Sequence, residues 1–434
     1  MDSPQNIHIS DYNYDLPEER IAKFPMARRD QSKLLVYRHG EVTEDIFCNL
    51  PDYLPENALM VFNNTKVIQA RLHFFKETGA QIEIFLLEPA IPADYEQMFQ
   101  THGRCSWYCL IGNLKKWKEG TLTRKLNTAD GELVITATRG PQHGTSHRVD
   151  FEWELVSQPS ALNSQPSTLN HQPSTLNSLP STLNPQLSFA EVIDSIGELP
   201  IPPYLNRKSE ESDKTTYQTV YSKIKGSVAA PTAGLHFTPE VLAAIDSKGI
   251  DREELTLHVG AGTFKPVKSE EIGGHEMHTE FFAVRRQTLE KLLQHDCHAI
   301  TVGTTSVRTL ESLYYIGLRL HVNPDRTADQ MHISQWEPYT TNVAIPVSQA
   351  IRNILDWMDR NAADVFHGST QIIIVPGYEY KIVERLVTNF HQPKSTLLLL
   401  VSAFVHGDWH RIYDYALGHD FRFLSYGDSS LLVP

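Results

Sequence analysis

The feature that most constrains the fold is a local pattern that occurs four times: an apolar run, a loop of small residues, and a helical stretch. In the first copy, residues 226–237, the apolar residues 228–230 predict the end of a buried strand, and a Pro-Thr-Ala-Gly turn follows. Thr238 suits the N-cap of the next helix, with Pro239 at its first position. The repeated pattern favours a large α/β sheet whose loops gather at one edge, where such proteins bind ligands.

Three further copies of the pattern lie towards the C-terminus. The expected strands are 255–264, 299–303 and 371–377, and the expected helices are 307–315, a stretch that ends at Leu386, and 396–405. Ser306 and Ser395 are the expected caps of the first and last of these helices. His258 lies just before Gly260 in the first of the three loops, so a second histidine is expected beside a Gly-rich turn.

The middle of the N-terminal half has a different pattern. Residues 67–154 contain short runs in which apolar and polar residues alternate, with turn residues between them, which predicts a small all-β domain, a barrel. Residues 157–184 are near-copies of one uncharged, proline-containing heptapeptide, which predicts a flexible linker. The expected organisation is an α/β domain over 1–66 and 189–434, an inserted β-barrel over 67–156, and a linker over 157–188.

Composition limits the class of protein. With 434 residues, 41% hydrophobic and 21% charged, the chain suits a globular protein of two or three domains. Its longest strongly apolar run, 397–405, is too short to span a membrane, and its N-terminus has no secretory pattern. The four cysteines are expected to be reduced thiols in a cytoplasmic protein.

The spacing of cysteine and histidine predicts no metal site. Cys105 and Cys109 are spaced like the start of an iron–sulfur motif, but position 112, where a third thiolate would be needed, is a glycine. His275 and His278 form an i,i+3 pair for which no third ligand is evident.

The charge of the chain leaves nucleic-acid binding open. The net charge of −13 argues against an RNA partner at first sight, but basic residues gather in the zones 115–125 and 207–225. These two zones are either solvated surfaces or salt-sensitive RNA contacts.

Several long motifs occur together and in a fixed order. They include Val61–Val67, Gly226–Thr238, Gly303–Glu311, Asn389–His391 and Pro393–Thr396. On these motifs, nearly the whole chain resembles the family of S-adenosylmethionine:tRNA ribosyltransferase-isomerases of queuosine biosynthesis. The heptapeptide repeat and residues 317–368 stand as insertions, and Gln392 occupies a position that is usually apolar in that family.

The resemblance implies an α/β domain, a β-barrel and an enzyme that modifies tRNA. The implied reaction moves the ribosyl unit of S-adenosylmethionine onto 7-aminomethyl-7-deazaguanine at the tRNA wobble position, giving epoxyqueuosine-tRNA and releasing adenine and methionine. The implied partners are this tRNA and S-adenosylmethionine, which is consumed as a substrate, so we expect no resident cofactor. We also expect a monomer with no membrane association.

The implied reaction defines what the site must supply. The sulfonium acidifies the C5′ protons for a base, and adenine needs a proton as it leaves. His236 and His258, in two Gly-flanked loops, are the expected acid and base; a structural role is the alternative for each. His278 and Glu280 are a further expected catalytic pair, or else a solvated face.

The remaining expected contacts bind substrate. The helix mouth at Gly303, with Arg308 one turn inside, suits the methionine carboxylate or a sugar hydroxyl, and capping is the alternative. Asn389 suits adenine or ribose, Tyr217 suits a base, and Asn63 suits substrate, tRNA phosphate or an inter-domain brace. The expected substrate-binding set is Gly234, Gly260, Gly262, Thr263, Gly303, Thr304, Thr305, Ser306, Arg308, Asn389, His391, Tyr217, Gln218, Asn64, Lys66 and Arg71.

Two other functions compete with this interpretation. A non-catalytic RNA-binding protein would use the barrel and the basic zones, but binding alone needs no histidines that titrate near neutrality. A serine hydrolase would use Ser306 or another serine with a histidine, but the chain has no G-x-S-x-G elbow. Adenine release from S-adenosylmethionine, with and without the precursor tRNA, separates these functions.

Overall fold

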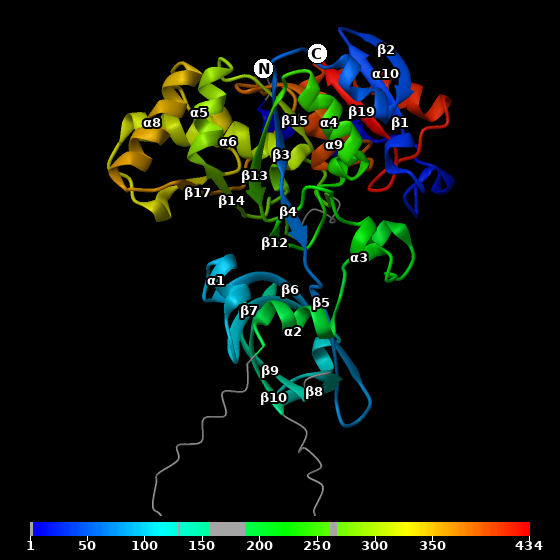
Figure 1. Ribbon diagram of the computed structural model, residues 1–434, viewed down its shortest axis with the longest axis vertical. Coiled ribbons are helices and arrows are strands. Elements are labelled where there is room, and N and C mark those ends of the chain that lie inside the picture. The colour runs from blue at the N-terminus through cyan, green and yellow to red at the C-terminus, as the bar shows by residue number, and fades with distance from the viewer. Residues whose placement is uncertain (1–2, 129–130, 157–186, 261–266) are drawn as a thin grey trace, which may run out of the picture. The chain divides into compact units, whose positions relative to one another are not determined.

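The chain divides into two compact units in the computed structural model, which describes residues 3–128, 131–156, 187–260 and 267–434. The α/β unit comprises Met1–Val67 and Pro200–Pro434, and the β unit comprises Ile68–Leu199. Figure 1 shows both units, with labels on many of their helices and strands.

A ten-stranded mixed sheet forms the centre of the α/β unit. Its strand order is β16-β17-β14-β13-β3-β15-β18-β19-β1-β2, and the four adjacent strands β13, β3, β15 and β18 run parallel. The bounds are β16 His332–Ile333, β17 Val365–Thr370, β14 Glu280–Arg285, β13 Asp251–Leu257, β3 Leu59–Asn63, β15 Ala299–Val302, β18 Val383–Asn389, β19 Ser429–Val433, β1 Lys33–Arg38 and β2 Glu41–Ile46. The expected large mixed-sheet α/β fold is therefore confirmed.

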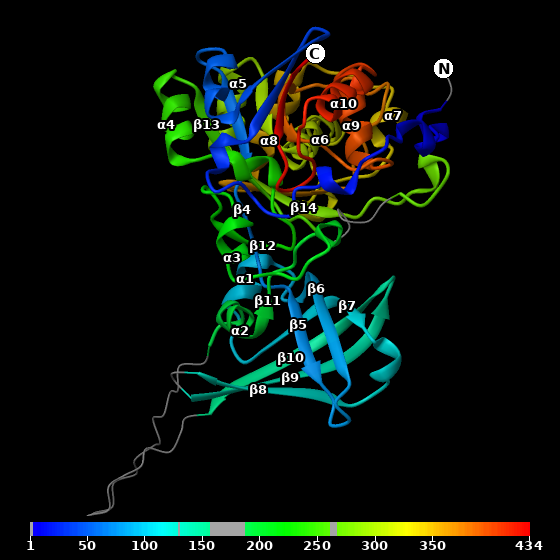
Figure 2. The ribbon, with the colours of Figure 1, turned by 90° about the vertical axis from the view of Figure 1, so that its right-hand side faces the viewer.

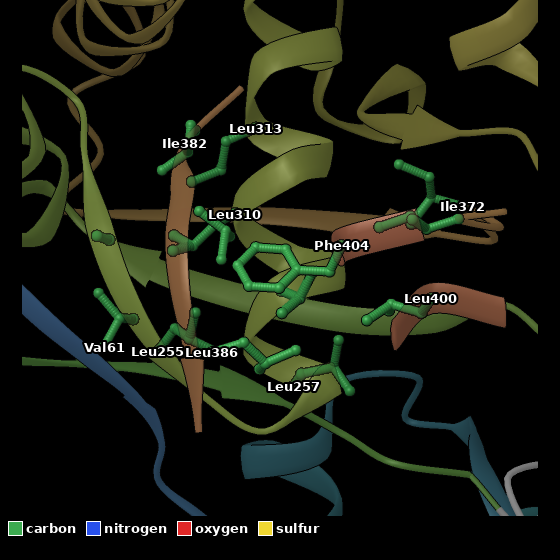
Figure 3. Close-up of a cluster of buried hydrophobic side chains, with 14 of the residues drawn as sticks. Val61, Leu255, Leu257, Leu310, Leu313, Ile372, Ile382, Leu386, Leu400 and Phe404 are labelled. Atoms are coloured by element: carbon green, nitrogen blue, oxygen red, sulfur yellow. The ribbon is translucent and has the colours of Figure 1, made fainter. Parts of the chain in front are cut away.

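Helices cover both faces of this sheet. Every residue of β3 is buried, and alternate side chains face opposite sides: Val61 packs in one core cluster, Met60 and Phe62 in another. The first cluster holds Leu310 and Leu313 of the long helix α6 (Figure 3). The α-helices of the unit are α3 Asp213–Thr216, α4 Pro239–Ser247, α5 Arg286–Gln294, α6 Thr304–Val322, α7 Glu337–Thr340, α8 Val347–Arg360, α9 Thr396–Phe404 and α10 Trp409–Gly418.

The β unit is a curled antiparallel sheet (Figure 2). Its order is β11-β5-β6-β7-β10-β9-β8, with bounds β5 Arg71–Phe75, β6 Gln81–Ile91, β7 Arg104–Gly112, β8 Thr121–Thr128, β9 Gly131–His143, β10 Ser146–Val156 and β11 Gly197–Glu198. In the described part of this unit no ladder joins β8 to β5; instead Arg124 Nη1 donates to the carbonyl of His73 at 3.0 Å. The sheet is thus an open, half-closed form of the expected barrel.

The division of the chain differs from the sequence prediction at residue 189. Helix α2, Phe189–Ile196, belongs to the β unit, together with the short helix α1, Tyr95–Gln100. The reason is aromatic packing: the ring centroid of Phe189 lies 5.6 Å from that of Trp107 and 5.5 Å from that of Trp153.

Two of the three helix caps predicted from the sequence are confirmed, at the starts of α4 and α9. The side chain of Thr238 accepts from Val241 N at the start of α4, and that of Ser395 accepts from Leu398 N at the start of α9. Ser306 is not a cap, because α6 begins at Thr304 with Gly303 as its N-cap, and Ser306 Oγ donates to Val302 O at 2.9 Å.

Three predictions of strands and helices are wrong. The strand expected to end at 228–230 is β12, Ile224–Ser227, which pairs with β4, Thr65–Val67, and ends earlier. Residues 371–377 form no strand, and the stretch expected to be a helix up to Leu386 contains the start of β18. β18 is extended because it fits between β15 and β19 and hydrogen-bonds to both.

None of the helices in the part of the chain that the structure describes has both the length and the hydropathy that a bilayer crossing requires.

Candidate functional site

A cleft in the α/β unit opens where the neighbouring parallel strands β15 and β18 end. The chain after β15 forms the mouth of α6, and the chain after β18 leads to α9, so both loops contribute to one wall. This is the carboxyl edge of the parallel strands, the usual position of ligand sites in α/β sheets. The predicted site residues that line the cleft are Tyr217, His278, Glu280, Gly303, Thr304, Thr305, Arg308, Asn389 and His391.

The N-terminal end of α6, its mouth, lies at the cleft. Gly303 has φ 85° and ψ 152°, a conformation that L side chains rarely adopt, and it turns the chain abruptly from β15 into the helix. The first-turn N–H groups of any helix lack acceptors within the helix, and the helix dipole favours an anion beside them. Thr304 and Thr305 line the cleft at this point.

Arg308 adds a buried cation one turn inside the helix. Its guanidinium donates from Nη1 to Glu280 Oε2 and from Nε to the carbonyl of Ile372 at 3.2 Å. Its Nη2 is buried with no hydrogen-bond partner among the described residues, although the side chain lines the cleft and Arg308 is only 7% exposed. An unpaired guanidinium donor of this kind is suited to a carboxylate or phosphate oxygen.

Asn389, at the end of β18, is held on both sides of its amide. Thr232 Oγ1 donates to Asn389 Oδ1 at 2.8 Å, and Asn389 Nδ2 lies 3.2 Å from His236 Nε2. The other ring nitrogen of His236, Nδ1, lies 2.8 Å from Ser32 Oγ. The four side chains form one hydrogen-bonded chain, buried at Ser32, His236 and Asn389 and partly buried at Thr232, and its last two members line the cleft.

His236 lies behind Asn389 and is not among the residues that line the cleft. Burial lowers the pKa of His236 to about 3, so its ring is neutral at physiological pH. Its role as an acid or base stays a prediction, and its position favours a role in holding Asn389.

His391 does line the cleft, just after β18. Its Nε2 lies 3.0 Å from Thr388 Oγ1, its backbone N–H bonds to Tyr413 Oη at 2.9 Å, and Tyr14 Oη donates to its carbonyl. Burial lowers the pKa of His391 to about 4, so this ring too is neutral near pH 7.

The segment before β14 brings His275 and His278 to the same cleft. Burial, and secondly the nearby His278, lower the pKa of His275. Gln335 holds this segment like a strand partner: its Oε1 accepts from Met277 N at 2.9 Å and its Nε2 donates to His275 O at 2.7 Å. No cluster of three or more potential metal ligands occurs in the described ranges.

Several predicted residues lie outside the cleft lining. His258 and Gly260 follow β13 without lining it, and Gly262 and Thr263 lie outside the described residues. Gly234 provides close packing, because a Cβ there would lie 1.8 Å from Tyr221 Oη.

Gln218 and Asn64, which were predicted to contact substrate, hydrogen-bond to other residues of the protein near β4. Gln218 bonds to both backbone groups of Val67, at 3.0 and 2.9 Å. Asn64 donates to Glu254 at 3.1 Å and accepts from Thr256 at 2.7 Å.

Asn63, Lys66 and Arg71 also lie outside the residues that line the cleft. Asn63 Nδ2 donates to Leu257 O at 3.1 Å, and Lys66 pairs with Lys225 in the β4–β12 ladder. Arg71 belongs to the β unit, where its Nη1 lies 3.7 Å from Glu83.

Two members of the predicted basic zone 207–225 also have acidic partners within the α/β unit. Arg207 makes a bidentate pair with Asp213 at 2.7 Å for each contact, and Lys223 lies 2.7 Å from Glu254. These partners limit the positive charge that the zone offers to RNA.

The sequence interpretation missed residues that complete the cleft. Tyr204 and Ser425 line it and share a 2.6 Å hydroxyl contact, and burial raises the pKa of Tyr204 to about 12. From the sequence, Thr232 was predicted only as a turn residue. His275 was considered only as one member of a histidine pair that lacks a third metal ligand. The run Pro-Ile-Pro-Pro-Tyr at 200–204, which ends in Tyr204, was an available indication, because the prolines before this tyrosine restrict its backbone position.

The fold and the cleft together define an α/β protein with a polar cleft at the carboxyl edge of its sheet. A family profile described as queuosine biosynthesis protein matches residues 9–432. The chain belongs to this family, and it is an enzyme of the transferase-isomerase class.

Two curated relatives are similar over almost their whole length. The S-adenosylmethionine:tRNA ribosyltransferase-isomerase of Treponema denticola is 34% identical over 98% of this chain and 99% of its own. The protein of the same name from Sulfurihydrogenibium is 36% identical over 98% of this chain and 99% of its own. The crystal structure of S-adenosylmethionine tRNA ribosyltransferase from Thermotoga maritima is 25% identical over 98% of this chain and all of that chain, with a TM-score of 0.43.

Proposed function

We propose that this protein transfers the ribosyl unit of S-adenosylmethionine to the aminomethyl group of 7-aminomethyl-7-deazaguanine at the tRNA wobble position, giving epoxyqueuosine-tRNA. Methionine leaves with the electron pair of the C5′–S bond, and adenine leaves with that of its glycosidic bond and takes up a proton. The amine gains a bond to a sugar carbon and loses a proton. C5′ loses a second proton to a base, the electron pair left on C5′ forms the new carbon–carbon bond of the cyclopentane ring, and the ring oxygen of the ribose becomes the epoxide oxygen, so no external oxidant or reductant is needed. The family and its named relatives support this reaction.

The observation that carries the proposal is the unpaired Nη2 of Arg308 beside the mouth of α6. The methionine part of S-adenosylmethionine ends in a carboxylate, which a guanidinium N–H and helix N-terminal N–H groups would bind together. Glu280 and Ile372 O fix the guanidinium before any ligand arrives, so little ordering is needed on binding.

The histidines of the cleft differ in what they offer to proton transfer. His391 is held neutral by burial, so at pH 7 its ring is available as a hydrogen-bonding group or as a weak base. His275 and His278 approach the cleft from the β14 side, and burial together with the nearby His278 lowers the pKa of His275, which favours its neutral, basic form. We assign the base and the donor of the adenine proton to this pair, ahead of the buried His236.

Adenine release tests the proposed function. Purified protein is mixed with S-adenosylmethionine, with and without tRNA that carries the aminomethyl precursor, and free adenine and methionine are measured. We expect equal amounts of both products only when the tRNA is present, and a loss of at least tenfold in kcat/KM for Arg308→Met. Products without tRNA would indicate a nucleosidase-like activity, and tRNA binding without products would indicate a binding protein; either result refutes the proposal.

A further inference from the structure

The amide of Asn389 has a single favoured orientation, which follows from its neighbours. The ring of His236 is neutral, so one of its nitrogens carries a proton and the other accepts. Nδ1 lies 2.8 Å from Ser32 Oγ, which can accept its proton, and Nε2 lies 3.2 Å from Asn389 Nδ2, which only donates. Nε2 is then an acceptor, and it requires the NH₂ side of the Asn389 amide to face it.

The hydroxyl of Thr232 supports the same orientation from the other side. It donates to Asn389 Oδ1 at 2.8 Å, which places the oxygen of the amide away from His236. Asn389 is 3% exposed and His236 is 4% exposed, so water does not compete for the bond between them. The amide therefore cannot rotate without breaking one buried and one partly buried hydrogen bond.

The held amide keeps hydrogen-bonding capacity for a ligand. A primary amide has two N–H donors and two oxygen lone pairs, and His236 and Thr232 use one of each. One N–H and one lone pair remain on a side chain that lines the cleft. The Watson–Crick edge of adenine offers the complement, an amino N–H beside the ring acceptor N1, and asparagine recognises the same donor–acceptor pattern at the N6/N7 edge of adenine elsewhere.

We propose that Asn389 recognises the adenine edge of S-adenosylmethionine, with His236 and Thr232 as positioning residues that hold its amide in the orientation adenine requires. The inference rests on the proposed function for the identity of the ligand. Adenine is favoured over the tRNA base because Asn389 shares the cleft with Arg308, which would bind the opposite end of the same molecule.

Replacing adenine by hypoxanthine in the donor distinguishes an Asn389 amide that is fixed in one orientation from one that can rotate. The edge of hypoxanthine carries the same two functions in exchanged positions, an acceptor at C6 and a donor at N1. A free asparagine would rotate and bind either base, whereas a held one rejects hypoxanthine. We therefore expect the protein to prefer S-adenosylmethionine over S-inosylmethionine by roughly ten- to a hundredfold.

The experiment compares these two donors in wild-type protein and in three variants. Equilibrium binding of each donor is measured without tRNA, and kcat/KM for base release is measured with the precursor tRNA. We expect Asn389→Leu to lose most of the preference by weakening the binding of S-adenosylmethionine. We expect His236→Leu and Thr232→Val to reduce the preference at least threefold, because the amide becomes free to rotate and accepts hypoxanthine better.

Thr301→Val is the matched control, since Thr301 is buried, its hydroxyl donates to Arg385 O at 3.3 Å, and it is not among the residues that line the cleft. Its preference should equal that of the wild type, and thermal unfolding checks that every variant is folded. A wild-type ratio of affinities for the two donors near one would overturn the inference. So would variants that weaken the binding of both donors equally. So would variants that affect only the binding of the tRNA base. If no base is released at all, the proposed function fails, while the binding ratio still decides the role of Asn389.

Discussion

Acid should destabilise the α/β unit through His236, and the size of the effect follows from its burial. The pKa of His236 is about 3 in the folded chain, against 6.5 as its ordinary value, so the unfolded chain takes up a proton that the folded chain refuses. The contribution of the neutral His236 ring to the free energy of unfolding is fully present above pH 6.5 and is lost as the pH falls towards 3. At pH 5, about 1.5 pH units below the ordinary value, the loss is about 2 kcal/mol from this one residue.

The assay is urea unfolding of wild type and His236→Gln at intervals between pH 7.5 and pH 5. The glutamine cannot titrate, so the fall in the free energy of unfolding should be about 2 kcal/mol smaller in the variant than in the wild type. His391 is still present in the variant and keeps its own acid sensitivity, so a residual slope is expected. Thr301→Val serves as a control without a titratable change. Equal slopes in wild type and His236→Gln would refute the reasoning.

Three further changes have defined outcomes. Arg308→Lys keeps a positive charge but loses the two parallel N–H donors of the guanidinium, so KM for S-adenosylmethionine should rise at least tenfold in steady-state assays, with little change in thermal unfolding. An unchanged KM would contradict the proposal that Arg308 binds the carboxylate. Glu311→Gln should lower the free energy of unfolding by about 2–4 kcal/mol in urea, because the buried carboxylate accepts from Tyr378 Oη and from the N–H groups of residues 381–383 at 2.8–3.0 Å; a loss below about 1 kcal/mol would contradict this. Gly303→Ala should cost about 1–2 kcal/mol of stability and also weaken S-adenosylmethionine binding, whereas Gly377→Ala, at a similar φ of 94°, should affect stability alone.

Local chemistry explains which parts of the fold could be predicted from the sequence. The helix starts at Thr238 and Ser395 depend on a side chain and the N–H three residues later, so the sequence contains the whole interaction. The run 371–375 is apolar like a strand, but its backbone bonds to scattered partners, such as Ile333 O and Tyr339 Oη, and forms no ladder. That outcome depends on residues far away in the sequence.

The sequence motifs predicted which residues contribute to the candidate site, but they did not predict which way each side chain faces. Arg308, Asn389 and Gly303 were expected to share a site, and they line one cleft. His236 has the same local sequence features as a cleft residue, yet its ring faces Ser32, which is 204 residues away in the chain. A single sequence does not encode which side of a loop faces solvent, so a buried and a cleft-facing histidine look the same in it.

The carboxylate of Glu311 has a consequence for which donors the enzyme accepts. It joins the middle of α6 to the first residue of β18, so the helix that carries Arg308 and the strand that ends at Asn389 are fastened to each other. In the proposed function Arg308 and Asn389 bind the two ends of the donor, so their constant separation would set the length of ligand that reaches both. A donor whose amino-acid tail is one methylene shorter or longer should fail to reach both ends at once, whatever its charge or base.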